Sequence, residues 1–135
     1  MSFVIDTSAI IAIMKLESDA TEYASVLASE TPRYISAGTR FECGIVVGRE
    51  LGPKGLANLR ILLEGTNVET VPFDGAQSEA GLQGYMTYGR GSGHKAGLNF
   101  GDCFAYALAK TRKLPLLFKG DDFIHTDVEP ALKRA

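Results

Sequence analysis

Short apolar runs alternate with longer amphipathic stretches along this 135-residue sequence, and this alternation limits the class of fold that the chain can adopt. Four short segments predict strands, at residues 3–5, 34–35, 68–71 and 114–118. Helical stretches lie between consecutive strands, an order typical of parallel sheets that are covered by helices on both faces. We therefore expect an α/β fold, a three-layer α/β/α domain with a short, mostly parallel central sheet.

The amphipathic stretches predict helices at residues 9–15, 18–28, 38–51, 53–64, 77–88 and 102–113. Thr7 or Ser8 is the expected cap of the first helix. Gly52-Pro53 separates the third helix from the fourth. On the third helix the helical spacing places Phe41 and Ile45 on one side, beside Glu42.

Composition indicates an ordinary domain that needs no cross-link. A chain of 135 residues that is 45% apolar can bury a core without disulfides or a structural metal, and its two cysteines, Cys43 and Cys103, are too isolated for a zinc site. The longest apolar run, residues 103–109, is far shorter than the roughly 20 residues that span a bilayer. The N-terminus does not read as a secretion signal. We expect a single domain over residues 1–135, cytoplasmic and without a membrane segment.

Carboxylates stand at the ends of the expected elements. Asp6 directly follows the first strand, Asp121 and Asp122 follow the last, and Asp102 begins a helix. Each has an ordinary explanation, since Asp6 and Asp102 can cap helices and adjacent aspartates are common in turns. However, ligands of α/β sheets bind outside the carboxyl ends of the strands, where this topology can gather these acids.

Glu42 interrupts an otherwise apolar stretch of the third helix, where it is either a solvated position or a fourth acid of the same cluster. Several carboxylates in one pocket repel each other unless a cation compensates their charge. Ligand sets made only of oxygen select hard divalent ions such as Mg²⁺ or Mn²⁺. Such ions can activate water and stabilise the leaving oxygen of a phosphodiester. The acids therefore predict a hard-metal site.

Basic residues are concentrated in one part of the chain, although the formal net charge is only −2. Residues 90–119 contain six basic side chains and one acid, a balance that suits a polyanion. Three of the six lie at the end of the expected helix 102–113 and are better explained as charges at a helix C-terminus. Arg90 and Lys95 lie in a glycine-rich stretch, residues 89–101, that reads as a shaped loop near a ligand, and Lys119 fits either role.

Four segments carry the candidate acids in a recognisable order. They are Phe3-Val4-Ile5-Asp6-Thr7-Ser8-Ala9, Arg40-Phe41-Glu42-Cys43, Asn99 to Ala109, and Phe118-Lys119-Gly120-Asp121-Asp122-Phe123. This ordered set resembles the PIN domain and, within it, the VapC-type ribonuclease toxins of bacterial toxin–antitoxin pairs. The similarity covers essentially the whole chain.

The resemblance implies a Mg²⁺-dependent endoribonuclease, with Mn²⁺ as the alternative, that a VapB-type antitoxin inhibits. It also implies a homodimer and a toxin–antitoxin hetero-oligomer. By matching position, the catalytic and metal-binding acids are Asp6, Glu42, Asp102 and Asp121. The residues that support them are Thr7, Ser8 and Asp122, and those assigned to RNA binding are Arg90, Lys95 and Asn99. We choose Asp121 over Asp122 because Asp122 and Phe123 begin a short helix.

Two other classes of function compete with this interpretation. One is a non-catalytic PIN-fold module that binds RNA or a protein. The loss of an essential acid would favour this interpretation, but no essential acid is missing. The other is a small phosphatase or response-regulator-like domain that uses Asp6 for phosphoryl chemistry. That interpretation leaves Glu42 and Asp102 without a joint role.

Overall fold

A four-stranded parallel sheet forms the centre of the computed structural model, which describes residues 2–29 and 32–133. Its strands are β1 (Phe3–Ile5), β2 (Arg33–Ser36), β3 (Val68–Val71) and β4 (Leu116–Leu117), in the spatial order β3-β2-β1-β4. Val4 of β1 lies opposite Tyr34 of β2 and Leu116 of β4. The short parallel sheet expected from the sequence is therefore confirmed.

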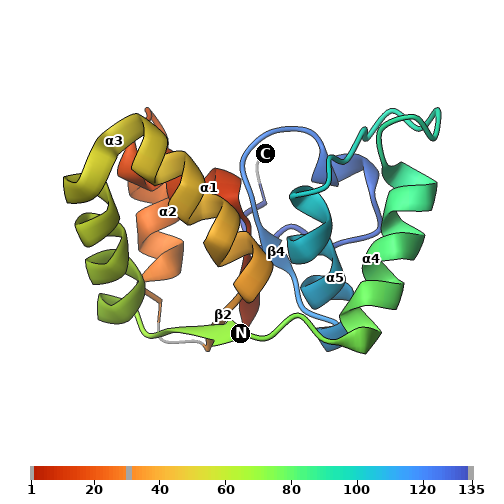
Figure 1. Cartoon of the computed structure of the whole chain (residues 1–135), viewed down its shortest axis with the longest axis horizontal. Coiled ribbons are helices and arrows are strands. Elements are labelled where there is room, and N and C mark those ends of the chain that lie inside the picture. Colours follow the sequence, from red (N-terminus) through yellow and green to blue (C-terminus); the bar gives the residue numbers. More distant parts are fainter. Residues whose placement is uncertain (1, 30–31, 134–135) are drawn as a thin grey trace.

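Helices cover both faces of the sheet. They are α1 (Thr7–Met14), α2 (Ala20–Leu27), α3 (Ala37–Gly65), α4 (Gly75–Tyr88) and α5 (Asp102–Arg112), followed by the 3₁₀ helix η1 (Phe123–His125). Figure 1 shows α1, α2 and α3 on one side of the sheet and α4 and α5 on the other. None of these helices is long and apolar enough to cross a membrane.

Strand residues alternate between two hydrophobic cores. Phe3 and Ile5 of β1 pack into the core beneath α1–α3, together with Leu117 of β4. Val4 and Leu116 pack on the other side, against α5. This alternation follows from the pleat of a strand, whose successive side chains point to opposite faces. It explains why β1 and β4 are apolar on both faces.

The third and fourth expected helices are one element, α3, with a kink at Gly52 (φ 68°, ψ −166°). Glycine tolerates this backbone conformation, so the predicted break lies where the sequence places it. Phe41 and Ile45, which the helical spacing places on one side, are 72% and 43% exposed, while Cys43 and Val47 are buried. Two apolar stripes are offset by two residues on this helix, and periodicity alone does not tell which one faces the core.

Helix α5 is buried along most of its length, between the sheet and α4. Its buried residues are Ala105, Tyr106, Ala107, Leu108 and Ala109. The ring of Tyr106 occupies the place that a side chain at Gly84 of α4 would need. The glycines that weaken α4 as a helix therefore allow it to pack closely on α5.

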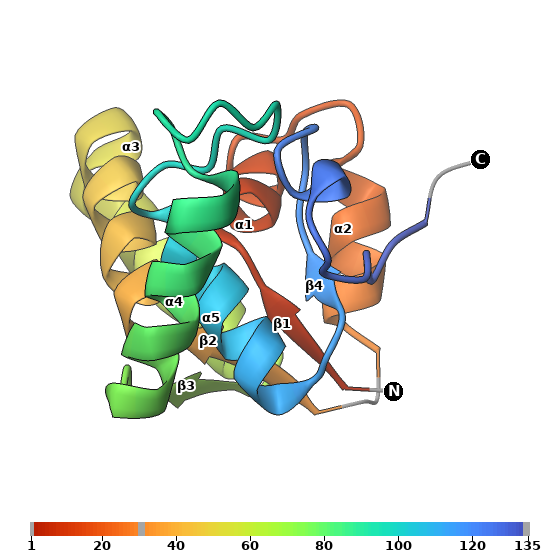
Figure 2. The ribbon, with the colours of Figure 1, turned by 90° about the vertical axis from the view of Figure 1, so that its right-hand side faces the viewer.

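The carboxyl ends of the strands face three loops. Figure 2 shows the start of α1, the glycine-rich loop (residues 89–101) and the segment after β4 at the same end of the sheet. The glycine-rich loop is pinned by a bridge between Gly89 and Leu98. At the edge of the sheet, the backbone N–H of Ala131 donates to the carbonyl of Leu116 in β4 (2.8 Å). The candidate site lies among the three loops.

Candidate functional site

Asp6 joins β1 to α1 and is only 3% exposed. Its Oδ2 accepts hydrogen bonds from the backbone N–H of Ser8 (3.0 Å) and from the Ser8 hydroxyl (2.7 Å). The N-cap of α1 is thus Asp6, not Thr7 or Ser8. Its other oxygen, Oδ1, is buried without a hydrogen-bond partner. Asp6 therefore starts a helix with one oxygen and presents the other to the site.

Burial raises the pKa of Asp6 to about 7, although the two hydrogen bonds from Ser8 oppose the shift. The carboxylates of Asp102 and Glu42 raise this pKa further, so the three acids share one electrostatic environment. A buried oxygen without a partner is costly, and neighbouring negative charge increases the cost. A bound cation would relieve both.

Glu42 reaches this environment from the second turn of α3. The hydroxyl of Thr7 donates to its Oε1 at 2.6 Å. Its Oε2 lies against Gly101, in the place that a Cβ at position 101 would take. The missing side chain of Gly101 therefore lets the Glu42 carboxylate approach the start of α5.

Asp102 is the first residue of α5 and is fixed by a reciprocal pair of hydrogen bonds with Asn99. The backbone N–H of Asn99 donates to Asp102 Oδ2 (3.0 Å), and the backbone N–H of Asp102 donates to Asn99 Oδ1 (2.8 Å). This is the pattern of a capping box. Asn99, expected to bind substrate, thus contacts the acid beside it.

Burial also raises the pKa of Asp102, to about 6, against the hydrogen bond from the Asn99 N–H. Asp122 and Glu42 raise this pKa further and Arg90 lowers it. Asp121, the sequence-based choice for the fourth acid, is not one of the groups with the largest effects on this pKa. Asp122 also stands at the N-terminus of η1, as expected. Of the two adjacent acids, Asp122 is the one coupled to Asp102.

Each of the three central acids, Asp6, Glu42 and Asp102, has a carboxylate oxygen that accepts a hydrogen bond from the protein. The held oxygens are Asp6 Oδ2, Glu42 Oε1 and Asp102 Oδ2. Within residues 2–29 and 32–133, no three His, Cys, Asp or Glu side chains lie close enough together to hold a metal ion as they stand. The acids are thus coupled electrostatically without forming a finished ligand set. The residues fit a cation best at Asp6, whose Oδ1 is buried and unpaired.

Five of the six basic residues of segment 90–119 fall into two groups, and the sixth, Lys113, is exposed at the C-terminal end of α5. Arg90 and Lys95 are exposed on the glycine-rich loop, and Arg90 acts on Asp102. Three others contact neighbours elsewhere: Lys110 pairs with Asp127, Arg112 lies over the Tyr34 ring, and Lys119 pairs with Glu17 and Asp19. The exposed positive charge that acts on the acids therefore lies on the glycine-rich loop.

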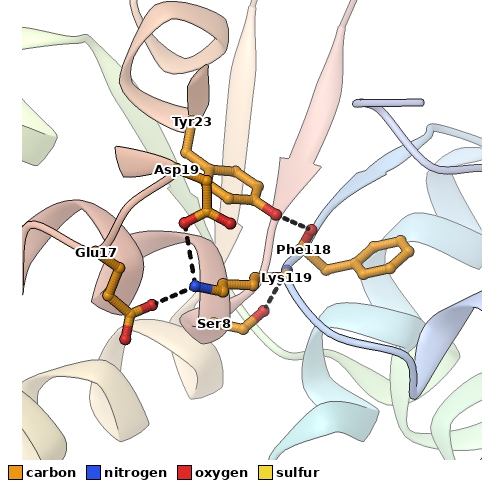
Figure 3. Close-up of polar contacts among 6 residues, drawn as sticks. All are labelled: Ser8, Glu17, Asp19, Tyr23, Phe118 and Lys119. Atoms are coloured by element: carbon orange, nitrogen blue, oxygen red, sulfur yellow. Dashed lines mark hydrogen bonds and ion pairs between the residues drawn. The ribbon is translucent and has the colours of Figure 1, made fainter. Parts of the chain in front are cut away.

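Sequence reasoning missed a polar cluster beside Asp6, drawn in Figure 3. The backbone N–H of Lys119 donates to the Ser8 hydroxyl (2.9 Å), which itself donates to Asp6. The ammonium of Lys119 contacts Glu17 and Asp19, about a hundred residues away in the chain. No local pattern in the sequence connects positions so far apart.

Comparison with known proteins gives a consistent picture. The model of the PIN domain family matches residues 3–129. Ribonuclease VapC28 of Mycobacterium tuberculosis is 47% identical over 131 residues, which cover 97% of this chain and 98% of that protein. Ribonuclease VapC of Mycolicibacterium smegmatis is 43% identical over 125 residues, covering 93% and 96%.

Solved structures show the same fold at low sequence identity. Mycobacterium tuberculosis VapC20, described as a sarcin-ricin loop cleaving toxin, matches with a TM-score of 0.73 at 16% identity, over 95% of this chain and 99% of its own. A chain of VapBC2 from Rickettsia felis, bound to a DNA fragment from its promoter, matches with a TM-score of 0.71 at 16% identity, over 92% and 91%.

Proposed function

Because this chain belongs to the PIN domain family and, within it, to the VapC ribonucleases, we propose that it is an endoribonuclease that acts as the toxin of a toxin–antitoxin pair. The observation that carries the proposal is the 47% identity to a named ribonuclease over nearly the full length of both chains. The reaction is hydrolysis of RNA phosphodiester bonds at the cluster of acids beside the carboxyl ends of the strands.

A divalent cation, Mg²⁺ or Mn²⁺, is the proposed cofactor. When bound, such an ion activates a water molecule and stabilises the leaving oxygen of a phosphodiester. Asp6, Glu42 and Asp102 would hold it, and the unpaired, buried Oδ1 of Asp6 supports this assignment. Thr7 and Ser8 each fix one carboxylate oxygen, which orients the other toward the ion.

We assign the fourth acid to Asp122 instead of Asp121. Asp122 raises the pKa of Asp102, which means that its charge is felt at the proposed metal site. A cation bound at Asp102 would therefore also be attracted by Asp122. This assignment revises the choice made from the sequence, where the two adjacent aspartates could not be separated by position.

The RNA backbone is proposed to lie along the glycine-rich loop. Arg90 and Lys95 are exposed there, and the effect of Arg90 on Asp102 places its charge next to the acids. These side chains can offset the repulsion between the carboxylates and the phosphates of the substrate. Asn99 is assigned to the placement of Asp102, because both its backbone N–H and its side-chain oxygen contact that residue.

A VapB-type antitoxin is the proposed protein partner, and a homodimer the proposed assembly of the toxin. An RNA-cleaving enzyme harms its host unless it is inhibited, and an arginine of the partner could occupy the acidic site through charge-assisted hydrogen bonds. Exposed apolar side chains, among them Phe41, Met86 and Phe100, support protein contacts of this kind. Co-expression with a neighbouring antitoxin gene, followed by size-exclusion chromatography and growth rescue, tests the pairing.

The activity is tested by incubating the purified protein with structured RNA in Mg²⁺ or Mn²⁺ and mapping the cleaved ends. We expect cleavage that EDTA and Asp6→Asn both abolish. Asparagine is as good an N-cap as aspartate, so this variant keeps α1 while removing the charge. Asp74→Asn is the matched control, because Asp74 caps α4 through a hydrogen bond to Gln77, away from the three central acids. Intact RNA under every metal condition would leave a binding module as the better interpretation.

A further inference from the structure

We propose that Lys119 is a positioning residue, whose backbone and ammonium together fix the segment that carries Asp122 beside Asp6. This proposal rests on the proposed function, since it assigns a role toward the same metal site. The sequence left Lys119 between two roles, a contact with RNA and a surface charge. Its observed partners indicate a third role.

The first tether is formed by the backbone of Lys119. Its N–H donates to the hydroxyl of Ser8 at 2.9 Å, and that hydroxyl donates to Oδ2 of Asp6 at 2.7 Å. Because the Ser8 oxygen accepts a hydrogen bond from the N–H of Lys119, its own O–H is directed at Asp6. The backbone after β4 and the carboxylate after β1 are therefore linked through a single side chain.

The second tether is formed by the ammonium. Nζ of Lys119 contacts Glu17 Oε1 at 2.8 Å and Asp19 Oδ1 at 3.1 Å, both in the connection between α1 and α2. The Lys119 side chain is about one third exposed, at 35%. Figure 3 shows it between the two acids. With its charge already matched by two carboxylates, Lys119 is poorly suited to bind a phosphate.

The residues next to Lys119 are held as well. The hydroxyl of Tyr23 on α2 donates to the carbonyl of Phe118 at 3.2 Å. Beyond the acids, Phe123 is buried and packs against the Phe118 ring, with centroids 5.2 Å apart. Asp121 and Asp122 thus lie on a short segment between two anchors.

The turn between the anchors depends on Gly120, whose φ of 103° lies in a region that side chains rarely adopt. Because the turn follows Lys119 directly, a shift of the Lys119 backbone would also shift Asp122. The ion pairs of Lys119 therefore help to fix the position of Asp122, and its backbone hydrogen bond helps to orient Asp6 through Ser8.

The experiment compares Lys119→Met and Glu17→Gln with the parent protein. Mn²⁺ affinity is measured by the EPR signal of free Mn²⁺, and exchange of the backbone amides of residues 119–123 is measured by hydrogen–deuterium exchange in metal-free protein. We expect Lys119→Met to weaken Mn²⁺ binding about 3- to 10-fold, near or below the lower end of the effect of groups that orient metal ligands. Amide exchange in residues 119–123 should become faster, and KM for RNA should not change.

Lys15→Met is the matched control. Lys15 also forms a 2.8 Å ion pair at comparable exposure of 40% and 46%, but its partner is Glu50 of α3, which belongs neither to the segment after β4 nor to the connection between α1 and α2. It should leave Mn²⁺ affinity and amide exchange as in the parent. Glu17→Gln should shift both in the same direction as Lys119→Met, which shows that the effect does not come from one unfolded variant.

Two results overturn the proposal. One is a Lys119→Met variant with the Mn²⁺ affinity and the exchange of the parent. The other is a Lys119→Met variant with a raised KM for RNA and an unchanged Mn²⁺ affinity, together with a Glu17→Gln variant that binds RNA more tightly. That pair of results would mean that the Lys119 ammonium contacts RNA and does so better once Glu17 no longer pairs with it. If the parent protein cleaves no RNA, the proposed function fails while the metal and exchange measurements still decide the role of Lys119.

Discussion

Oε2 of Glu42 lies against the backbone of Gly101, in the place where any side chain at position 101 would begin. The contact joins the second turn of α3 to the residue before α5. Two of the three central acids, Glu42 and Asp102, therefore keep their spacing only while residue 101 has no Cβ.

Gly101→Ala is expected to displace the Glu42 carboxylate. The displaced atoms are the end of a flexible side chain, so the cost in stability should be no more than about 1 kcal/mol, the value of the lost Thr7 hydrogen bond. We expect cleavage to fall by about tenfold or more, as for other groups that orient metal ligands. Urea unfolding and RNA cleavage measure the two effects. Gly44→Ala is the control, because a Cβ at Gly44 of α3 meets nothing within 4 Å. Parent-like activity in Gly101→Ala would show that the position of Glu42 does not matter.

Replacement of the two adjacent aspartates separates them functionally. Asp122→Asn should lower cleavage about 10- to 100-fold and weaken Mn²⁺ binding, because Asp122 is the acid coupled to Asp102. Asp121→Asn, one residue away, should stay within about threefold of the parent, a change of less than 1 kcal/mol in the barrier. The reverse order of effects would restore Asp121 as the fourth acid.

The stability of the metal-free protein should fall as the pH rises from about 4 to 7. Because the folded-state pKa of Asp6 is raised from 3.8 to about 7, the folded chain holds a proton in this range that the unfolded chain has released. Asp6 alone accounts for at most about 4 kcal/mol of this loss. Asp102, whose pKa is raised to about 6, adds to it. Urea unfolding in EDTA at several pH values measures it.

Asp6→Asn should flatten this pH dependence and be the more stable protein at pH 8, whereas Asp74→Asn should keep the slope of the parent. Mn²⁺ should stabilise the parent more at pH 8 than at pH 5, since binding needs the ionised carboxylate. A parent protein whose stability rises steadily across this range would contradict the assignment of a buried, protonated Asp6.

Arg90→Gln tests the proposed path of the RNA. Loss of a phosphate contact should raise KM for RNA and reduce the slope of log affinity against log salt by about 0.7, the value for one contact on a single strand. Cleavage rates against salt concentration supply both quantities. Lys113→Gln removes one charge at the far end of α5 and should leave the slope unchanged. Equal effects of the two variants would indicate general attraction without a defined contact.

Much of this fold could be predicted from local patterns. The strands and the break at Gly52 follow from short apolar runs and from glycine and proline signals, which act over a few residues. The buried stripe of α3 could not be predicted, because Cys43 and Val47 alternate with the equally apolar Phe41 and Ile45. Only the packing of α3 on the sheet selects between the two stripes.

The candidate site shows the same limit. The acids could be selected from their places at element ends, but their partners could not. Lys119 meets Glu17 across 102 positions of sequence, and the contact between Glu42 and Gly101 is equally nonlocal. The choice between Asp121 and Asp122 also depends on tertiary structure, since adjacent residues in a turn point in different directions.

The strand order β3-β2-β1-β4 also has a consequence for synthesis on the ribosome. The first strand to be made, β1, receives its second neighbour only when Leu116 and Leu117 have emerged. Asp102 and Lys119 belong to the same late portion of the chain. A nascent chain thus carries Asp6 and Glu42 long before Asp102 and Asp122 exist, so the acidic cluster cannot assemble until the segment after β4 has emerged.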